Sequence, residues 1–239
     1  MIEWQDRALI LSARAFSDTD AILTVLTREQ GKVAGLVRGG QSRRRAADLQ
    51  IGNLVQVTWR ARLEDQLGAF DLELERSFAS AYLDDRARLS ALEAFNAMAQ
   101  QALGEREPVP GLFDATLTWL EYLDEDFWPQ LYVKLELGLL KALGFAVDFD
   151  ACALKGDAND LSHVSPKTGR AVSAQMAEPY AAKLLKLPQF LGGSSNLGDQ
   201  EVLAGLTLSG TLLARHVFAA LNRDLPGGRH RLAEHLGLS

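Results

Sequence analysis

The stretch that decides the N-terminal fold runs from Ala21 to Arg38 and reads AILTVLTREQGKVAGLVR. Two runs rich in β-branched residues, 21–27 and 32–38, flank the segment Arg28-Glu29-Gln30-Gly31. A charged turn that ends in glycine between two such runs is typical of a β-hairpin. We therefore expect two antiparallel strands here.

The strand pattern continues on both sides of this hairpin. Residues 7–12 form a short apolar run, while residues 54–60 and 70–75 alternate between apolar and polar side chains. Period-two alternation indicates one buried and one solvated face, and it places Trp59 in the core rather than on a base-stacking surface. Five strands within 80 residues predict a small closed barrel, which fits both the OB type and an SH3-like barrel.

After residue 80 the apolar residues recur at three- and four-residue steps, as in amphipathic helices. We expect helices near 89–103, 112–123, 126–143, 179–187, 199–222 and 229–236. The core face of the helix at 199–222 would include Val202, Leu206, Leu213, Val217 and Leu221. The helix near 126–143 is apolar nearly all round and should be the central one, with Gly144 as its C-terminal cap. Residues 145–178 lose all periodicity and are rich in turn formers. The domains predicted are thus a β barrel at 1–80 and a helical domain at 81–239, with an irregular insert at 145–178.

The formal charge of −6 is unevenly distributed. Residues 1–80 are neutral, so the whole deficit lies in 81–239. Within 28–45 one acidic residue, Glu29, faces six basic ones, and such a local patch can attract phosphates because salt screens beyond roughly 8–10 Å. The alternative is that the basic residues of 28–45 belong to a solvated surface loop without a binding role. The candidate DNA-binding residues are Lys32, Arg38, Arg43, Arg44, Arg45, Arg60 and Arg62. The glycine-containing segment 39–42 before the arginine triplet is expected to be flexible.

Catalytic motifs are missing from the sequence. It lacks the G-x-x-x-x-G-K-[ST], G-x-S-x-G and H-E-x-x-H patterns, and its four histidines lack metal-site spacing. Cys152 is the single cysteine and is expected to be an inert, partly buried thiol. We therefore expect a binding protein and not an enzyme, although a hydrolase that uses Cys152 or acidic residues stays open as an alternative.

No apolar run reaches the roughly 20 residues of a membrane-spanning helix, and the N-terminus does not read as a signal peptide. Together with the low cysteine content this favours a cytoplasmic protein without a membrane partner.

Several ordered segments carry a family resemblance. They are Trp4-Gln5, RAFSDTD at 14–20, Gly31-Lys32-Val33, VRGG at 37–40, SRRR at 42–45, Leu135-Glu136-Leu137, Leu143-Gly144-Phe145 and SPKTGRAVS at 165–173. In this order and spacing the chain resembles, over nearly its full length, the RecO family of DNA repair and recombination mediators.

This resemblance implies an α+β multidomain fold, with an N-terminal OB-fold barrel and a helical domain that carries a zinc-finger-like insert. It implies binding of single- and double-stranded DNA, strand annealing, and work with RecR to load RecA on DNA coated by the single-strand-binding protein, SSB. The SSB C-terminal tail would contact Lys134, although Lys134 fits equally a lysine that extends to solvent from a core helix. We expect a monomer when the protein is alone. An OB-fold RNA-binding or ribosome-associated accessory protein is the alternative.

The insert departs from zinc-bearing members of that family, which have two C-x-x-C pairs. The corresponding positions here are Cys152, Lys155, Ser173 and Met176. Because one thiolate cannot hold tetrahedral zinc, we predict no metal and no other cofactor. Packing by Phe149, Leu154, Val164 and Val172 would have to hold the insert instead.

Overall fold

The computed structural model describes residues 1–63, 66–109, 111–145, 147–154, 156–192 and 198–238. They form two compact units, Met1–Leu120 and Glu121–Ser239. Each unit is described by itself below.

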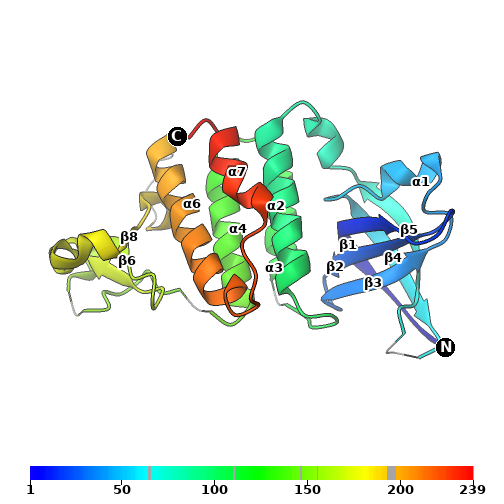
Figure 1. The fold of residues 1–239 in the computed structure, drawn as a ribbon, viewed down its shortest axis with the longest axis horizontal. Coiled ribbons are helices and arrows are strands. Elements are labelled where there is room, and N and C mark those ends of the chain that lie inside the picture. The colour runs from blue at the N-terminus through cyan, green and yellow to red at the C-terminus, as the bar shows by residue number, and fades with distance from the viewer. Residues whose placement is uncertain (64–65, 110, 146, 155, 193–197, 239) are drawn as a thin grey trace. The chain divides into compact units, whose positions relative to one another are not determined.

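Five strands of the first unit close into a barrel in the order β1-β2-β3-β5-β4 (Figure 1). Neighbouring strands are antiparallel except β3 and β5, which meet in parallel through Leu36 and Ala69. This order is that of an OB fold, so it decides between the two barrel types that the sequence left open. The strands are β1 Ile2–Ala15, β2 Ala21–Thr27, β3 Lys32–Val37, β4 Leu54–Ala61 and β5 Ala69–Arg76.

Strand β1 is much longer than the predicted strand at 7–12. Its first half, Ile2 to Leu9, pairs with β4, and its second half, Ala8 to Ala15, pairs with β2. The register shifts between Ile10 and Ser12. A strand that serves two partners in turn needs this length, and only the tertiary pairing reveals it.

The barrel core confirms the predicted alternation. Val55, Val57 and Trp59 are each 0% exposed, and Phe70 and Leu72 of β5 face the same interior. Burying each such side chain stabilises the fold by about 1.5–3 kcal/mol. The predicted hairpin is present too, and Gly31 has φ 71° in its turn. A Cβ there would lie 2.1 Å from the Glu107 carbonyl oxygen, so only glycine fits.

The sequence suggested a flexible segment before the arginine triplet. In the structure the triplet itself begins a short helix, α1, Arg43–Asp48. The Ser42 hydroxyl caps its start by accepting from the Arg45 N–H. At the other end the Asn53 side-chain amide donates to the carbonyl oxygens of Ala47 and Asp48, 3.0 Å each. These local hydrogen bonds satisfy both ends of the helix and give the basic segment a defined geometry.

The rest of the first unit is helical: η1 Ala79–Tyr82, α2 Arg86–Ala102 and α3 Leu112–Glu121. Asp85 caps α2 by accepting from the Arg88 N–H, and α2 packs against β1. The barrel ends at Arg76, close to the predicted boundary at 80, whereas the packed unit extends to Leu120.

Helix α4 is the most buried helix of the second unit, as its apolar sequence predicted. Ten of its residues are buried, and it packs mainly on α6, where Gly205 leaves room for Val133. The elements of this unit are α4 Trp128–Ala142, η2 Ala158–Asp160, β6 Leu161–Val164, β7 Ala171–Ser173, α5 Ala174–Ala177, η3 Glu178–Lys183, β8 Leu185–Lys186, η4 Gln189–Leu191, α6 Asp199–Leu213, the π-helical η5 Ala214–Phe218 and α7 Gly227–His235. Within the described residues, no helix is long and apolar enough to cross a membrane.

The irregular insert contributes β6 and β7 to a three-stranded sheet in the order β7-β6-β8, whose strand β8 follows the insert. Strand β8 and the 3-10 turn η3 occupy 178–186, where the sequence predicted a helix. Val164 and Val172 are buried as expected, but Leu154 is 50% exposed and does not hold the insert. Helical structure after Asp199 ends at Phe218, so Leu221 is exposed and not part of the core, a correction to the predicted helix.

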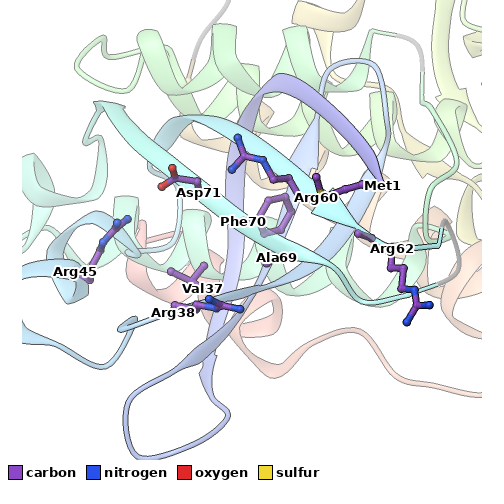
Figure 2. A pocket seen from close by; sticks show the side chains of 10 residues that line it. Met1, Val37, Arg38, Arg45, Arg60, Arg62, Ala69, Phe70 and Asp71 are labelled. Carbon is purple, nitrogen blue, oxygen red and sulfur yellow. The ribbon is translucent and has the colours of Figure 1, made fainter.

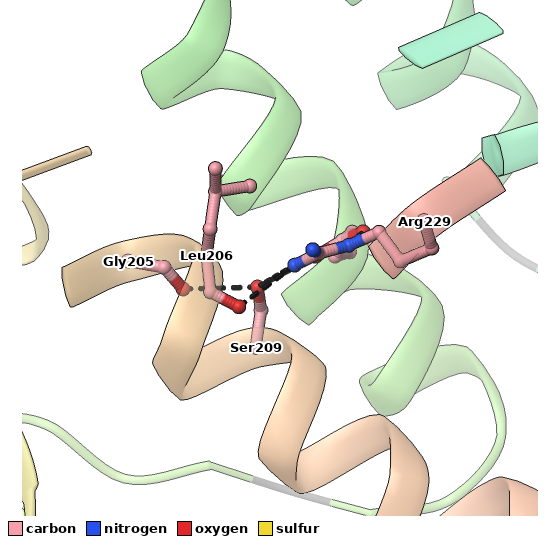
Figure 3. A network of polar contacts seen from close by, with 5 residues as sticks. Gly205, Leu206, Ser209 and Arg229 are labelled. Atoms are coloured by element: carbon pink, nitrogen blue, oxygen red, sulfur yellow. Dashed lines mark hydrogen bonds and ion pairs between the residues drawn. The ribbon is translucent and has the colours of Figure 1, made fainter. Parts of the chain in front are cut away.

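A buried polar network links three helices of this unit (Figure 3). Arg229 of α7 donates to both carboxylate oxygens of Glu136 in α4 and to the Leu206 carbonyl oxygen in α6, the last at 2.7 Å. Ser209 of α6 donates to the same carboxylate at 2.6 Å. Burial by itself lowers the pKa of Arg229, but the Glu136 carboxylate outweighs it and holds the guanidinium charged.

Candidate nucleic-acid interface

A pocket of about 480 Å³ lies on the barrel and is lined mainly by basic and apolar side chains (Figure 2). Among the described residues that line it, Asp71 is the one acidic residue, and the arginines are Arg38, Arg45, Arg60 and Arg62. Figure 2 shows the four guanidinium groups spread around the pocket and not converging on one point. This spread suits an extended polyanion better than a single small anion.

The strand order explains how these arginines come together. Leu36 near the end of β3 pairs with Ala69 at the start of β5, and Ala69 pairs with Arg60 near the end of β4. Arg38 and Arg62 directly follow β3 and β4. Residues more than 20 positions apart thus meet at one edge of the barrel.

A second pocket, of about 570 Å³, extends this surface. It shares Arg38 and Arg45 with the first pocket and adds Arg44 of α1, while Asp48 and Glu73 supply its negative charges. The five arginines that line the two pockets form what we call the arginine surface: Arg38, Arg44, Arg45, Arg60 and Arg62. The surface runs from the end of β4 to α1.

Arg60 forms an ion pair with Glu3 of β1, with 2.7 Å between Nε and Oε2. The hydrogen bond and the positive charge of Arg60 hold the pKa of Glu3 below its usual range. Both side chains are 45% exposed, so solvent screens the pair. A phosphate that binds Arg60 therefore has to compete with the Glu3 carboxylate.

Two of the seven predicted residues do not line the arginine surface. Lys32 is only 8% exposed, and its Nζ donates to the Gln100 carbonyl oxygen of α2 at 2.8 Å. This contact ties β3 to α2, and the assignment of Lys32 to DNA binding stays a prediction. Arg43 is exposed at the start of α1 but lines neither pocket.

Trp59 lies in the core, as predicted, and its Nε1 donates to the Leu67 carbonyl oxygen at 3.1 Å. Trp4 stacks on it, with ring centroids 5.5 Å apart, and the Arg106 guanidinium lies 4.6 Å from the Trp59 ring centroid. No local sequence pattern indicates this contact role of Trp4 or Arg106. The cross-strand pairing of Trp4 with Trp59 could not be seen until the full length of β1 was known.

The insert brings together three of the four positions that the family resemblance aligned with zinc ligands. Cys152 Sγ accepts from the Ser173 N–H at 3.3 Å, and a Cβ at Gly156 would collide with Ser173 Oγ, Met176 Cγ and Cys152 Sγ. Lys155, the fourth position, lies outside the described residues. Within the described part of the chain, no group of three or more His, Cys, Asp or Glu side chains could hold a metal ion. A zinc finger is therefore not shown, and the absence of metal stays a prediction.

The Cys152 thiol differs from the inert thiol that the sequence suggested. Burial raises its pKa, but backbone N–H groups of Ser173, Leu154 and Gly156 donate hydrogen bonds to the sulfur and lower the pKa to about 7. The side chain is partly exposed. A substantial thiolate fraction at neutral pH follows.

Lys134 is exposed on α4, one turn from Leu131 and Gly138 and two turns from Lys141 on the same side of the helix. Leu131 and Gly138 are partly exposed. We call these four residues the α4 strip. It combines two positive charges with one apolar side chain and contains no acidic residue.

Comparison with known families decides what kind of protein carries these features. The family model described as Recombination protein O N terminal matches residues 1–78, and the model described as Recombination protein O C terminal matches residues 83–224. The chain belongs to the RecO family of DNA repair proteins. The resemblance seen in the sequence is thereby confirmed.

Individual RecO relatives match over nearly their whole length. The DNA repair protein RecO of Rhodospirillum centenum is 48% identical over 235 residues, which cover 98% of this chain and 94% of the relative. The RecO proteins of Rhodospirillum rubrum and Hyphomonas neptunium are 44% and 43% identical and cover 99% and 98% of the chain. RecO membership supports a role in DNA repair and recombination and makes DNA the partner to consider for the arginine surface.

Proposed function

We propose that this protein is a recombination mediator without catalytic turnover, which holds single-stranded DNA on the arginine surface of its OB barrel. The observation that carries the proposal is the meeting of five arginines from β3, α1 and β4 along two adjoining pockets. Nearby charges dominate over the net charge of −6, because salt screens charges beyond roughly 8–10 Å. An OB barrel with such a groove suits a flexible single strand, and duplex DNA could contact it through one backbone.

Membership of the RecO family supports a finer proposal for the activity. The protein would anneal complementary strands and, with RecR, help to displace SSB and load RecA. Its contact with SSB would be the α4 strip, where Lys134 pairs with the carboxylates of an acidic tail and Leu131 contacts an apolar end residue.

Strand annealing on SSB-coated DNA tests this function. Complementary strands coated with SSB are mixed with the protein, and duplex formation is followed with intact SSB and with SSB that lacks its tail. We expect acceleration with intact SSB and a smaller effect without the tail. No acceleration in either case would exclude the mediator role.

An OB fold can also serve an RNA-binding or ribosome-associated protein, and RNA strands of the same sequence test this alternative. Preferential annealing of RNA, independent of the SSB tail, would favour it over the mediator role.

A further inference from the structure

A smaller pocket, of about 120 Å³, adjoins the arginine surface on the same barrel. We call it the aromatic slot. Its lining consists of Ile2, Trp4, Gln30, Val33, Trp59 and Arg106. All six lie within the first compact unit and within the described residues.

The slot presents a fixed aromatic ring. Trp4 stacks on Trp59 with 14° between the ring planes, and Trp59 is itself held by its hydrogen bond to Leu67 and by complete burial. Arg106 places its guanidinium over the Trp59 ring. Since Trp4 is held in place before any ligand arrives, a planar ligand that stacks there loses less free energy in ordering the protein.

The slot and the arginine pocket have no lining residue in common, but strands β3 and β4 contribute residues to both. In the β1–β4 register Glu3 pairs with Arg60 while Trp4 pairs with Trp59, so β4 contributes Arg60 to the arginine pocket and the preceding residue, Trp59, to the slot. Phe70, which lines the arginine pocket, also contacts the edge of Trp4, with centroids 6.3 Å apart. Figure 2 shows Phe70 among the residues that line the arginine pocket. Successive side chains of a strand point to opposite faces, so the link between the slot and the arginine pocket is the contact of Trp4 with Phe70 and not the spacing along the strand.

The volume of the slot limits its occupant. About 120 Å³ is close to the roughly 150 Å³ of an apolar cavity that admits benzene, and well below the roughly 300 Å³ of a drug-sized pocket. One planar ring can enter, at least in part, whereas a base pair cannot.

We infer that the aromatic slot takes one nucleobase of a single strand whose phosphates lie on the arginine surface. The inference rests on the proposed function and adds to it a place where a base is bound. The volume of the slot suits the single ring of a pyrimidine better than the two fused rings of a purine, and because the slot excludes a base pair it selects unpaired strands.

Abasic DNA tests the inference directly. Wild type, Trp4→Leu and Trp4→Phe are titrated with an oligothymidylate and with an abasic oligonucleotide of the same length, which keeps the phosphates but lacks the bases. We expect Trp4→Leu to weaken thymidylate binding by roughly 5- to 100-fold and to leave abasic binding unchanged. Trp4→Phe, which keeps a ring, should fall in between. Both ligands meet the same protein sample, so partial unfolding would weaken both equally.

Phe16→Leu is the matched control. Phe16 is 58% exposed and lines neither the slot nor the two arginine pockets. Its removal should leave both affinities unchanged. A selective loss with Phe16→Leu and none with Trp4→Leu would place the base elsewhere and overturn the inference.

Tryptophan fluorescence provides an independent readout. Trp59, Trp119 and Trp128 are at most 4% exposed, so a base that stacks in the slot should quench mainly Trp4. We expect quenching by thymidylate but not by the abasic strand, and its loss in Trp4→Phe. If Trp4→Leu weakened the binding of both oligonucleotides equally, or of neither, the inference about the slot would be wrong. If Arg38→Ala/Arg45→Ala still weakened binding in that case, the proposed function would stand, whereas no effect of these variants would refute both.

Discussion

Arg229 donates to both carboxylate oxygens of Glu136, which lies 93 positions earlier in the chain, and the two side chains are 7% and 0% exposed. The pair joins α7 to the central helix α4, and Ser209 of α6 completes it. A carboxylate at this depth is tolerated only because the guanidinium and the hydroxyl satisfy it.

Replacing Arg229 with Met should therefore leave the Glu136 carboxylate buried in the core without its guanidinium partner. We expect the free energy of unfolding to fall by about 3–5 kcal/mol, measured by urea denaturation. The double variant Glu136→Leu/Arg229→Met, which removes both charges, should recover most of this loss. If Arg229→Met lowered the free energy of unfolding by less than about 1 kcal/mol, the pair would contribute little to stability.

The arginine surface predicts a change in salt dependence. Arg38→Ala/Arg45→Ala removes the two residues shared by both pockets, and we expect the slope of log affinity against log salt on single strands to fall by about 1.4, or about 0.7 per phosphate contact. Arg43→Ala removes a neighbouring charge that lines neither pocket and serves as control. If Arg43→Ala changed the slope by as much per removed charge as the double variant does, the triplet would act only as a diffuse basic segment.

Local sequence patterns were sufficient for the hairpin, the alternating strands and the buried helix α4. They could not show that β1 pairs with two strands, because that pairing joins residues more than 40 positions apart. The choice of the OB fold over an SH3-like barrel also depended on long-range pairing, because the alternation of apolar and polar residues does not give the order of the strands in the barrel. The helix α1 was missed because its C-terminal carbonyl groups are satisfied by Asn53, which lies outside the segment.

For the candidate site too, the sequence indicated residues that are close along the chain and not those that only the fold brings together. Charge counting found Arg38, Arg44 and Arg45, which are close in sequence. It also included Lys32, whose burial against α2 depends on the contact with Gln100, and no local pattern marks that contact. The aromatic slot was missed entirely, because Trp4 and Arg106 are about a hundred residues apart and meet only in the folded barrel.

The ion pair between Glu3 and Arg60 limits how strongly Arg60 can bind a phosphate. Glu3→Gln should free the guanidinium and tighten single-strand binding by about two- to fivefold at low salt. Glu75→Gln is the matched control, because Glu75 pairs with Arg7, which lines neither arginine pocket. If both variants tightened binding equally, the effect would come from net charge and not from Arg60. Fluorescence anisotropy of a labelled oligonucleotide measures both.

The lowered pKa of Cys152 predicts a pH profile for its alkylation. Because Cys152 is the single cysteine, the rate of iodoacetamide modification reports on it alone, and it should reach half its maximum near pH 7. In urea the hydrogen bonds are lost, and the midpoint should rise to about 8.5. The folded state favours the thiolate, so this group stabilises the fold above its unfolded pKa, and the contribution is lost as pH falls through about 7. The same midpoint with and without urea would contradict this account.

The α4 strip predicts how an SSB tail is recognised. Lys134→Ala should weaken binding of an acidic peptide that ends in an apolar residue with a free carboxylate, by about 5- to 20-fold in calorimetry. Lys167→Ala, which removes an equal charge from an exposed turn of the insert, should have little effect. Amidating the peptide C-terminus should weaken its binding to the wild type but add little in Lys134→Ala, since the two changes break the same contact. If amidation and Lys134→Ala instead acted additively, Lys134 would attract the peptide only through general charge, and the carboxylate would bind elsewhere.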